Sequence, residues 1–266
     1  MERMVIGDFD RFAAPRDMRK VFRFRQDGRA QFVYNMFPKV KTMSEIRVIK
    51  VKQSVLANND SRAEQLRAEL KEKKVFLINV MSSPGSGKTT LLVNLINKLK
   101  KKGLRVGVME ADMDAIVDAE TVGKLTGVRT IQLHTSGECH LDAKMVSEGV
   151  EAIGDDDLDV IFLENIGNLV CPAEFDTGAA LKLVLLSIPE GDDKPLKYPL
   201  MFKVGNFFAF TKMDAKAVFD FDVGLAESHI LKLNPNAVFF PVSAKKDEGV
   251  EALASAIEAK IRDFCA

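Results

Sequence analysis

The sequence contains few of the residues that stabilise small secreted domains or attract polyanions. It has only three cysteines and three histidines among 266 residues, and its 38 Lys and Arg are balanced by 38 Asp and Glu. Three cysteines in a chain of this length do not make a disulfide framework and are typical of a reducing cytoplasm. The zero net charge gives no general reason to expect nucleic acid or an anionic membrane as a partner, since both normally require a basic excess.

Long apolar segments are also absent. No apolar run approaches the ~18 residues needed to span a bilayer. The chain begins Met1-Glu2-Arg3 without the apolar region of a signal peptide. We therefore expect a cytoplasmic protein with neither a membrane span nor a signal peptide. The length allows one large α/β domain or two smaller ones, because length sets only a soft prior on domain number.

Residues 1–42 differ in composition from the rest of the chain. They carry ten Lys and Arg against five Asp and Glu, and six of the 18 Phe. No motif lies there, and three interpretations stay open: a flexible basic arm, a small interaction element, or upstream sequence read through from an early start codon. We favour the third slightly, with Met43 as the true start, and expect residues 1–42 to be disordered or non-native and residues 43–266 to form one domain.

After Met43 the chain alternates strand-like and helix-like segments, which predicts an α/β fold with a mostly parallel sheet and helices on both faces. Expected strands cover residues 75–81, 105–110, 129–133, 160–164, 181–188, 207–211 and 237–242. Expected helices cover residues 58–73, 89–102, 115–125, 141–153, 223–233 and 250–264. The four residues 58–61 are candidate caps for the first helix, because Asn, Asp and Ser favour that position.

A glycine-rich turn with a phosphate-binding pattern follows the first expected strand. It reads Ser82-Ser83-Pro84-Gly85-Ser86-Gly87-Lys88-Thr89, with Thr90 next. In this setting backbone N–H groups surround phosphates, Lys88 reaches the β- and γ-oxygens and Thr89 ligates Mg²⁺. The usual first glycine is replaced by Ser82, so the match depends on Gly87, Lys88, Thr89 and the setting. A turn that binds nothing is disfavoured, because a Lys-Thr pair at this junction has no packing purpose.

Two later segments bear on the base of a nucleotide. Thr211-Lys212-Met213-Asp214 ends a strand and has the form in which the aspartate accepts two hydrogen bonds from guanine, a donor pair that adenine lacks. Ser243-Ala244-Lys245 follows the next strand, where guanine-binding proteins place a backbone N–H against the base oxygen. Each segment alone is weak evidence, but both lie at strand ends in the right order. They favour GTP over ATP.

Carboxylates near the phosphates are expected at neighbouring strand ends. Glu164 ends a strand in the carboxylate position, and Gly167 three residues later can offer its N–H to the γ-phosphate. Asp112 is a candidate magnesium ligand beside Thr89 and Glu164, and Asp118 a candidate for positioning the attacking water. For Asp112 and Asp118 the alternative is helix capping near residue 115.

Cysteine and histidine residues cluster in two segments. Cys139 and His140 are adjacent in a loop before a helix, and Cys171 follows just beyond the candidate switch. One metal ion requires about four ligands, so two ligands per chain at a two-fold interface would satisfy the geometry. Thiolate and imidazole select nickel, zinc or copper(I) over magnesium or calcium. The alternative, that the cysteines only pack and His140 is a hydrogen-bonded surface residue, stays open on the residues alone.

Together these segments resemble the HypB family of nickel-incorporation GTPases, which belong to the SIMIBI class of dimerising P-loop GTPases. The resemblance runs from about Met43 to the end and is carried by residues 81–90, 138–143, 164–172 and 195–202. The second and third of these segments are specific to nickel insertion.

The resemblance implies a GTPase that dimerises on binding GTP and holds Ni²⁺ or Zn²⁺ through Cys139, His140 and Cys171. It further implies delivery of nickel to the large-subunit precursor of a nickel-iron hydrogenase, together with a small zinc-containing partner, HypA. Some family members carry an N-terminal cysteine motif or a histidine-rich stretch, and residues 1–42 contain neither Cys nor His. A storage role is therefore not expected, and the metal site is expected in the GTPase domain.

Overall fold

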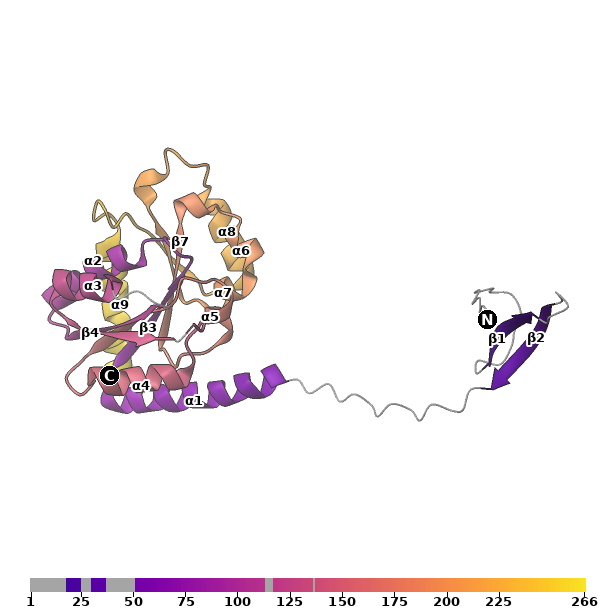
Figure 1. Cartoon of the computed structure of the whole chain (residues 1–266). Coiled ribbons are helices and arrows are strands. Elements are labelled where there is room, and N and C mark those ends of the chain that lie inside the picture. Colours follow the sequence, from indigo (N-terminus) through magenta and orange to yellow (C-terminus); the bar gives the residue numbers. More distant parts are fainter. Residues whose placement is uncertain (1–17, 25–29, 37–50, 113–116, 136) are drawn as a thin grey trace. The chain divides into compact units, whose positions relative to one another are not determined.

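The protein divides into two compact units, residues 1–50 and residues 51–266. The structure is a computed structural model, and it describes residues 18–24, 30–36, 51–112, 117–135 and 137–266 (Figure 1). In the first unit, strands β1 (Met18–Phe24) and β2 (Ala30–Met36) pair antiparallel, with Val21 opposite Val33. The interpretation of residues 1–42 as disordered or non-native stays a prediction.

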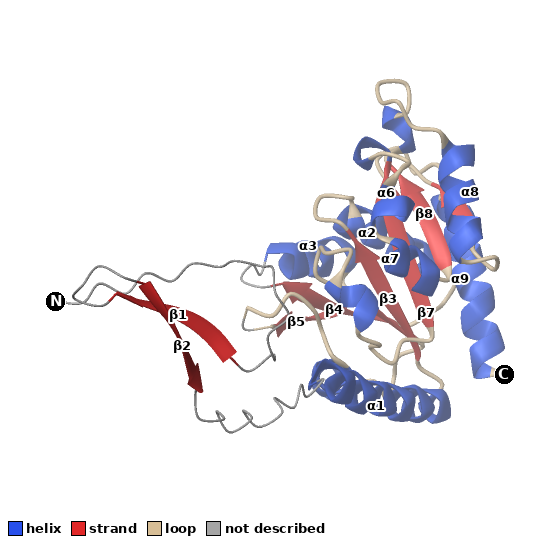
Figure 2. Ribbon diagram, turned by 90° about the vertical axis from the view of Figure 1, so that its right-hand side faces the viewer, coloured by secondary structure: helices blue, strands red, loops and turns tan. Residues whose placement is uncertain are grey.

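The second unit is built on a seven-stranded sheet in the order β5-β4-β6-β3-β7-β8-β9 (Figure 2). Every pairing between these strands is parallel. The strands are β3 (Phe76–Ser82), β4 (Val106–Asp112), β5 (Arg129–His134), β6 (Val160–Glu164), β7 (Leu181–Ser187), β8 (Phe207–Thr211) and β9 (Val238–Pro241). The carboxyl ends of parallel strands share one edge, where ligands of open α/β sheets bind.

Helices cover both faces of this sheet. Successive side chains of a strand point to opposite faces, and every residue of β3, β6 and β8 is buried. On one face, Ile78 and Val80 of β3 pack with α2 (Lys88–Lys101), α3 (Val117–Thr126) and α9 (Val250–Cys265). On the other, Leu77 packs with α1 (Val51–Lys73) and α4 (Ala143–Ile153). Met81 packs on that same face with α7 (Pro199–Val204) and α8 (Val223–Leu233). The predicted fold class is confirmed.

The first helix differs from the prediction at its start. It begins at Val51, so Asn58 to Ser61 lie inside the helix and do not cap it. Asn59 is buried and has tertiary partners: its amide donates to the carbonyl of Asp176 at 2.9 Å, and its Oδ1 accepts from the N–H of Ala143 at 2.8 Å. These two bonds satisfy its side chain inside the helix and join α1 to the start of α4.

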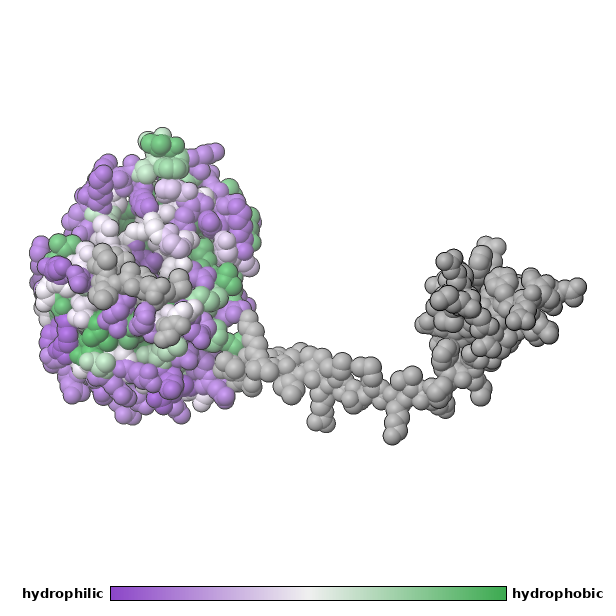
Figure 3. All heavy atoms as spheres, viewed as in Figure 1, coloured by the Kyte–Doolittle hydropathy of each residue, from purple (hydrophilic) through white to green (hydrophobic). Residues whose placement is uncertain are grey.

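Three short helices were not expected from the sequence. They are α5 (Cys171–Glu174), α6 (Lys194–Lys197) and α7, and each has a proline in its first turn. Figure 3 shows a mainly hydrophilic surface with an apolar cluster at the top of the second unit. The loop between β8 and α8 carries exposed apolar side chains, and Val218 there is 81% exposed. Among the residues described, no helix is long and apolar enough to cross a bilayer.

Candidate functional site: a phosphate loop joined to a thiol pair

The phosphate loop connects the central strand β3 to α2. Gly85 and Gly87 adopt positive φ values of 70° and 95°, which glycine adopts at no steric cost. Ser82, which replaces the usual first glycine, is fully buried and accepts a hydrogen bond from the Ser86 hydroxyl at 2.5 Å. Ser82 therefore adds a side-chain hydrogen bond within the loop, which glycine could not make. Lys88 and Thr89 open α2, so the backbone N–H groups of its first turn face the loop.

The carboxylate predicted nearest the phosphates lies against the loop. Glu164 ends β6 and is 2% exposed, and its Oε1 accepts a hydrogen bond from the Thr89 hydroxyl at 3.0 Å. Directly opposite it in the β4–β6 register lies Glu110, also 2% exposed. No sequence motif marked Glu110 as a site residue. Its position beside Glu164 follows only from the pairing of β4 with β6. The predicted residues Asp112 and Asp118 lie at the end of β4 and in α3, but their side chains fall outside the described part, so their roles stay predictions.

The two segments predicted to bind the base meet at one cavity of about 350 Å³ beside the phosphate loop. It is lined by Ser86, Gly87, Thr90, Thr211, Lys212, Asp214, Ala215, Ala244 and Lys245. The Thr211 hydroxyl donates to the carbonyl of Ser86 at 2.7 Å, and the Lys212 ammonium donates to the carbonyl of Gly85 at 2.7 Å. The base segments and the phosphate loop are therefore held together by hydrogen bonds within the chain.

Asp214 is oriented by its neighbour on the other base segment. The Ser243 hydroxyl donates to Asp214 Oδ1 at 2.7 Å and holds the pKa of that carboxyl below its usual value. Asp214 is therefore ionised at neutral pH, with a second oxygen available to accept hydrogen bonds. This is the state that recognition of guanine N1–H and the exocyclic amine requires.

The segment after Glu164 runs directly from the phosphate loop to the cysteines. A Cβ added to Gly167 would lie 2.9 Å from Pro84 Cα, so the backbone of this segment touches the loop. One residue later, the Asn168 amide donates to the carbonyl of Cys139 at 3.5 Å, and its Oδ1 accepts from the N–H of Val170 at 2.9 Å. The predicted switch glycine and the predicted ligand Cys171 thus belong to one short stretch of backbone, which also contacts the loop that carries Cys139.

The two predicted thiol ligands come together from loops 32 positions apart in the sequence. The Cys139 thiol donates to the Cys171 sulfur, with the two Sγ atoms 3.0 Å apart. This hydrogen bond, aided by burial and by the neighbouring charge, raises the pKa of Cys139. Cys139 is exposed, so the pair lies at the protein surface. The third cysteine, Cys265, is distant in the fold and donates to the carbonyl of Lys74.

His140 lies beside the thiol pair, and its ring stacks on Phe175 with centroids 3.8 Å apart. Its Nδ1 is buried without a hydrogen-bond partner, and its Nε2 lies 3.7 Å from Glu138 Oε2. Within the described ranges, no three His, Cys, Asp or Glu side chains are grouped closely enough to hold a metal ion. The structure therefore brings Cys139 and Cys171 together, with His140 adjacent, and the three-residue ligand set stays a prediction.

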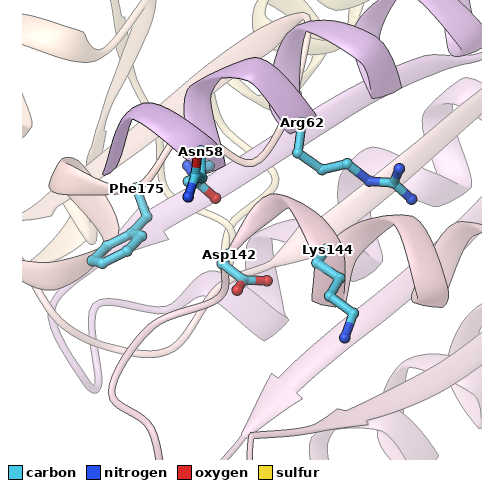
Figure 4. A pocket seen from close by; sticks show the side chains of 6 residues that line it. Asn58, Arg62, Asp142, Lys144 and Phe175 are labelled. Atoms are coloured by element: carbon cyan, nitrogen blue, oxygen red, sulfur yellow. The ribbon is translucent and has the colours of Figure 1, made fainter. Parts of the chain in front are cut away.

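A second cavity of about 530 Å³ adjoins this region (Figure 4). Asn58 and Arg62 approach it from α1, and Asp142 and Lys144 from the start of α4. Phe175 forms another wall, so one aromatic ring borders the cavity and also stacks on His140. Asp142 caps α4 by accepting a hydrogen bond from the N–H of Met145 at 2.8 Å, which fixes the end of the loop that carries Cys139.

Comparisons with known proteins show the family of the chain. The family described as CobW/HypB/UreG, nucleotide-binding domain, matches residues 75–240. The hydrogenase maturation factor HypB of Rhizobium leguminosarum bv. viciae is 43% identical over 219 residues, which cover 82% of this chain and 73% of that protein. The hydrogenase/urease maturation factor HypB of Helicobacter pylori is 38% identical over 207 residues, covering 76% and 84%.

Solved structures of HypB proteins are also similar to this chain. HypB from Helicobacter pylori in complex with nickel superposes with a TM-score of 0.73 at 37% identity, covering 77% of this chain and 96% of that one. HypB from Archaeoglobus fulgidus superposes with a TM-score of 0.71 at 30% identity, covering 77% and 100%. The chain therefore belongs to the CobW/HypB/UreG family and is a P-loop GTPase of the HypB type.

Proposed function

We propose that this protein is a nickel metallochaperone that serves hydrogenase maturation and uses GTP as its switch. In this proposal it delivers nickel to the large-subunit precursor of a nickel-iron hydrogenase, with a HypA-like zinc protein as its partner, in the cytoplasm. The relatives are described as hydrogenase maturation factors, and one solved relative contains nickel. The observation that carries the proposal is the approach of Cys139 and Cys171 to 3.0 Å beside the phosphate loop.

The backbone from Glu164 to Cys171 supports coupling between the nucleotide and the metal. It contacts Thr89 at one end, Pro84 in the middle and Cys139 at the other end. Binding of a γ-phosphate by the Gly167 N–H would draw this segment toward the loop, because contact with the third phosphate is what orders switch segments in GTPases. Hydrolysis would remove that contact and let Cys171 shift away from Cys139, releasing the ion.

The oxygen donors beside the loop fit Mg²⁺, which prefers carboxylate and hydroxyl ligands together with phosphate. Thr89 and Glu164 would hold it, with Asp112 as a further candidate, and the ion would neutralise charge on the β- and γ-phosphates. Lys88 would bind the same oxygens, and Asp118 would orient water. Without an arginine finger we expect hydrolysis on the order of 10⁻³ per second or slower.

Two thiols and one imidazole per chain support dimerisation. A nickel or zinc ion takes about four ligands, so two chains that each supply a thiol pair complete its coordination. Val170, next to Cys171, is 50% exposed, which is apolar surface at the place where a second chain would approach. The unpartnered Nδ1 of His140 is costly while it stays buried and unbonded, and metal binding would remove that cost.

A nickel titration of the reduced, metal-free protein tests the proposal. We expect a thiolate-to-nickel charge-transfer absorbance that changes when a non-hydrolysable GTP analogue is added and that disappears in Cys139→Ser and Cys171→Ser. Cys265→Ser is the matched control, since its thiol only donates to a carbonyl of Lys74, and it should keep the band. Absence of a thiolate band in both nucleotide states would contradict the metallochaperone proposal.

Substitution of Lys88 separates a switch from a plain metal-binding module. In Lys88→Ala we expect nickel binding to persist while hydrogenase maturation is lost, because the lysine binds phosphate and not metal. A maturation activity close to that of the wild type would favour a metal-binding module in which the nucleotide sets only dimerisation.

Urease is a second candidate client, because the Helicobacter relatives are described as hydrogenase/urease maturation factors. Complementation of strains that lack their own maturation GTPase can be read out as hydrogenase and as urease activity. Rescue of hydrogenase alone is expected here. Rescue of urease alone would reassign the client without changing the switch.

A further inference from the structure

The loop after β9 is shaped by its own backbone hydrogen bonds but anchored by α2. The N–H of Ser243 donates to the carbonyl of Glu248 at 2.9 Å, and the N–H of Glu248 donates back to Ser243 at 3.1 Å. These bonds close the turn that contains Ala244 and Lys245. They do not by themselves determine where the turn lies relative to the base cavity. The Ser243 bond to Asp214 holds the start of the turn, and contacts with α2 hold the rest.

Two side chains on one face of α2 supply those contacts. The Asn94 amide donates from Nδ2 to the carbonyl of Ala244 at 2.6 Å, across 150 positions of sequence. Lys98, four residues later and therefore on the same face of the helix, contacts Asp247 Oδ2 at 2.8 Å. Asn94 and Ala244 are both half-buried. Because α2 begins at Lys88, the helix that starts the phosphate site also holds the loop that lines the base cavity.

We propose that Asn94 is a positioning residue for guanine selectivity, acting from α2 through the carbonyl of Ala244 on the loop whose N–H groups face the base oxygen. This role for Asn94 adds a residue to the proposed guanine site and depends on that proposal. A fixed carbonyl fixes the peptide plane between Ala244 and Lys245, and with it the direction of the Lys245 N–H. Guanine and hypoxanthine both present an acceptor oxygen at C6, whereas adenine presents an amine there. The loop therefore separates guanine from adenine, while Asp214 also reads the exocyclic amine.

The test compares three diphosphates, GDP, IDP and ADP, in four proteins: wild type, Asn94→Ala, Asn94→Gln and Asn97→Ala. Asn97 is the matched control, because it lies three residues along the same helix and has no side-chain hydrogen bond in the described part of the chain. Alanine favours helix more than asparagine does, so Asn94→Ala should not weaken α2 itself. Equilibrium affinity for each diphosphate and thermal unfolding are measured on the full chain.

In Asn94→Ala we expect GDP and IDP to bind roughly 3- to 10-fold more weakly, the loss of one side-chain hydrogen bond to a neutral carbonyl. ADP affinity should not change, so the ratio of GDP to ADP affinity falls by that factor. The KM for GTP should rise with kcat unchanged, because the lost interaction is equal in ground and transition states. Asn94→Gln, which keeps an amide donor, should recover part of the ratio, and Asn97→Ala should match wild type.

Three results would overturn the inference. If Asn94→Ala lowers thermal stability but leaves the GDP to ADP ratio intact, the contact is only structural. If all three diphosphates weaken equally, the residue acts on the phosphate loop and not on the base. If wild type itself binds ADP as tightly as GDP, the proposed guanine site fails, and this inference fails with it.

Discussion

At the scale of single residues, Gly167 shows how closely the switch segment approaches the phosphate loop. An added Cβ would lie 2.9 Å from both the Cα and the N of Pro84, a distance that real Cβ atoms do not adopt. The obstacle is backbone and not a flexible side chain, so the neighbour cannot rotate away. The absence of a side chain at this position is a requirement of the contact.

We expect Gly167→Ala to slow GTP hydrolysis by about tenfold or more while GDP affinity changes little. The added methyl group would hold the segment away from the loop, and a misplaced N–H no longer reaches the γ-phosphate, a type of contact worth about 10²-fold or more in rate. Single-turnover hydrolysis and GDP binding measure the two effects separately.

Gly123→Ala provides the control for that substitution. Gly123 lies in α3, where an added Cβ would make only an ordinary contact at 3.6 Å with Thr130 Oγ1, so hydrolysis should stay normal. Equal losses of GTP and GDP affinity in Gly167→Ala would show that the methyl group disturbs the whole phosphate loop.

At the scale of elements, Asp176 joins α1 to the start of β7. Its Oδ2 accepts from Arg67 at 2.8 Å, its Oδ1 accepts from the N–H of Gly178 at 3.1 Å, and Lys182 lies 3.7 Å from Oδ1. Burial alone would raise the pKa of this carboxyl, but the charges of Lys182 and Arg67 outweigh burial, and the pKa lies below its usual value. The ionised form is therefore stabilised by folding.

Asp176→Asn should lower the free energy of unfolding by about 1 kcal/mol at pH 7, a modest value because both ion-pair partners keep contact with solvent. A carboxyl whose pKa is lowered by folding contributes its stability above the unfolded pKa and loses it as pH falls through the folded pKa. The difference between wild type and Asp176→Asn should thus be constant above about pH 5 and shrink below about pH 4. Urea unfolding across this range measures it.

Asp193→Asn is the comparison for the Asp176 experiment, because the pair of Asp193 with Lys197 is a single i,i+4 contact on an exposed helix. We expect little measurable change from it. A difference for Asp176→Asn that grows as the solution is acidified would contradict the sign argued from the lowered pKa.

The elements that the sequence predicted are those with a strong local pattern. The strand at residues 160–164 and the helix at 223–233 match their predicted bounds, because apolar runs and helical periodicity mark them. The start of α1 was wrong, since Asn59 resembles a cap until its distant partners are known. The short helix Cys171–Glu174 contains too few residues to show any period.

The residues of the candidate site also separate into those with a local sequence pattern and those without one. Lys88, Thr89 and Asp214 could be predicted from the sequence because phosphate and guanine recognition impose fixed local spacings. Asn94 and Glu110 were not singled out for function, because their contacts join segments far apart in sequence and leave no local signal. The residues alone left open whether Cys139 and Cys171 bind a metal or only pack, and the family resemblance favoured a shared metal.

At the scale of the whole molecule, everything assigned to the nucleotide and to the metal lies in residues 51–266. We expect a chain truncated to these residues to keep the midpoint of thermal unfolding within about 2 °C, a change of no more than about 1 kcal/mol for a domain of this size. GDP affinity and nickel stoichiometry should also be unchanged. Thermal unfolding and equilibrium binding, each compared with the full chain, measure these effects. A lower nickel stoichiometry would place a metal ligand or its support in residues 1–50.

The position of β3 at the centre of the sheet has a consequence for synthesis of the chain. Phe76 pairs with Val160 and Ile78 with Leu181, so both neighbours of this strand are made roughly 80 to 100 residues later. At about 5–20 residues per second, this fully buried strand waits several seconds on the ribosome without a partner. The nascent phosphate loop therefore exists before its sheet does, and these seconds are when the chain most needs protection from aggregation.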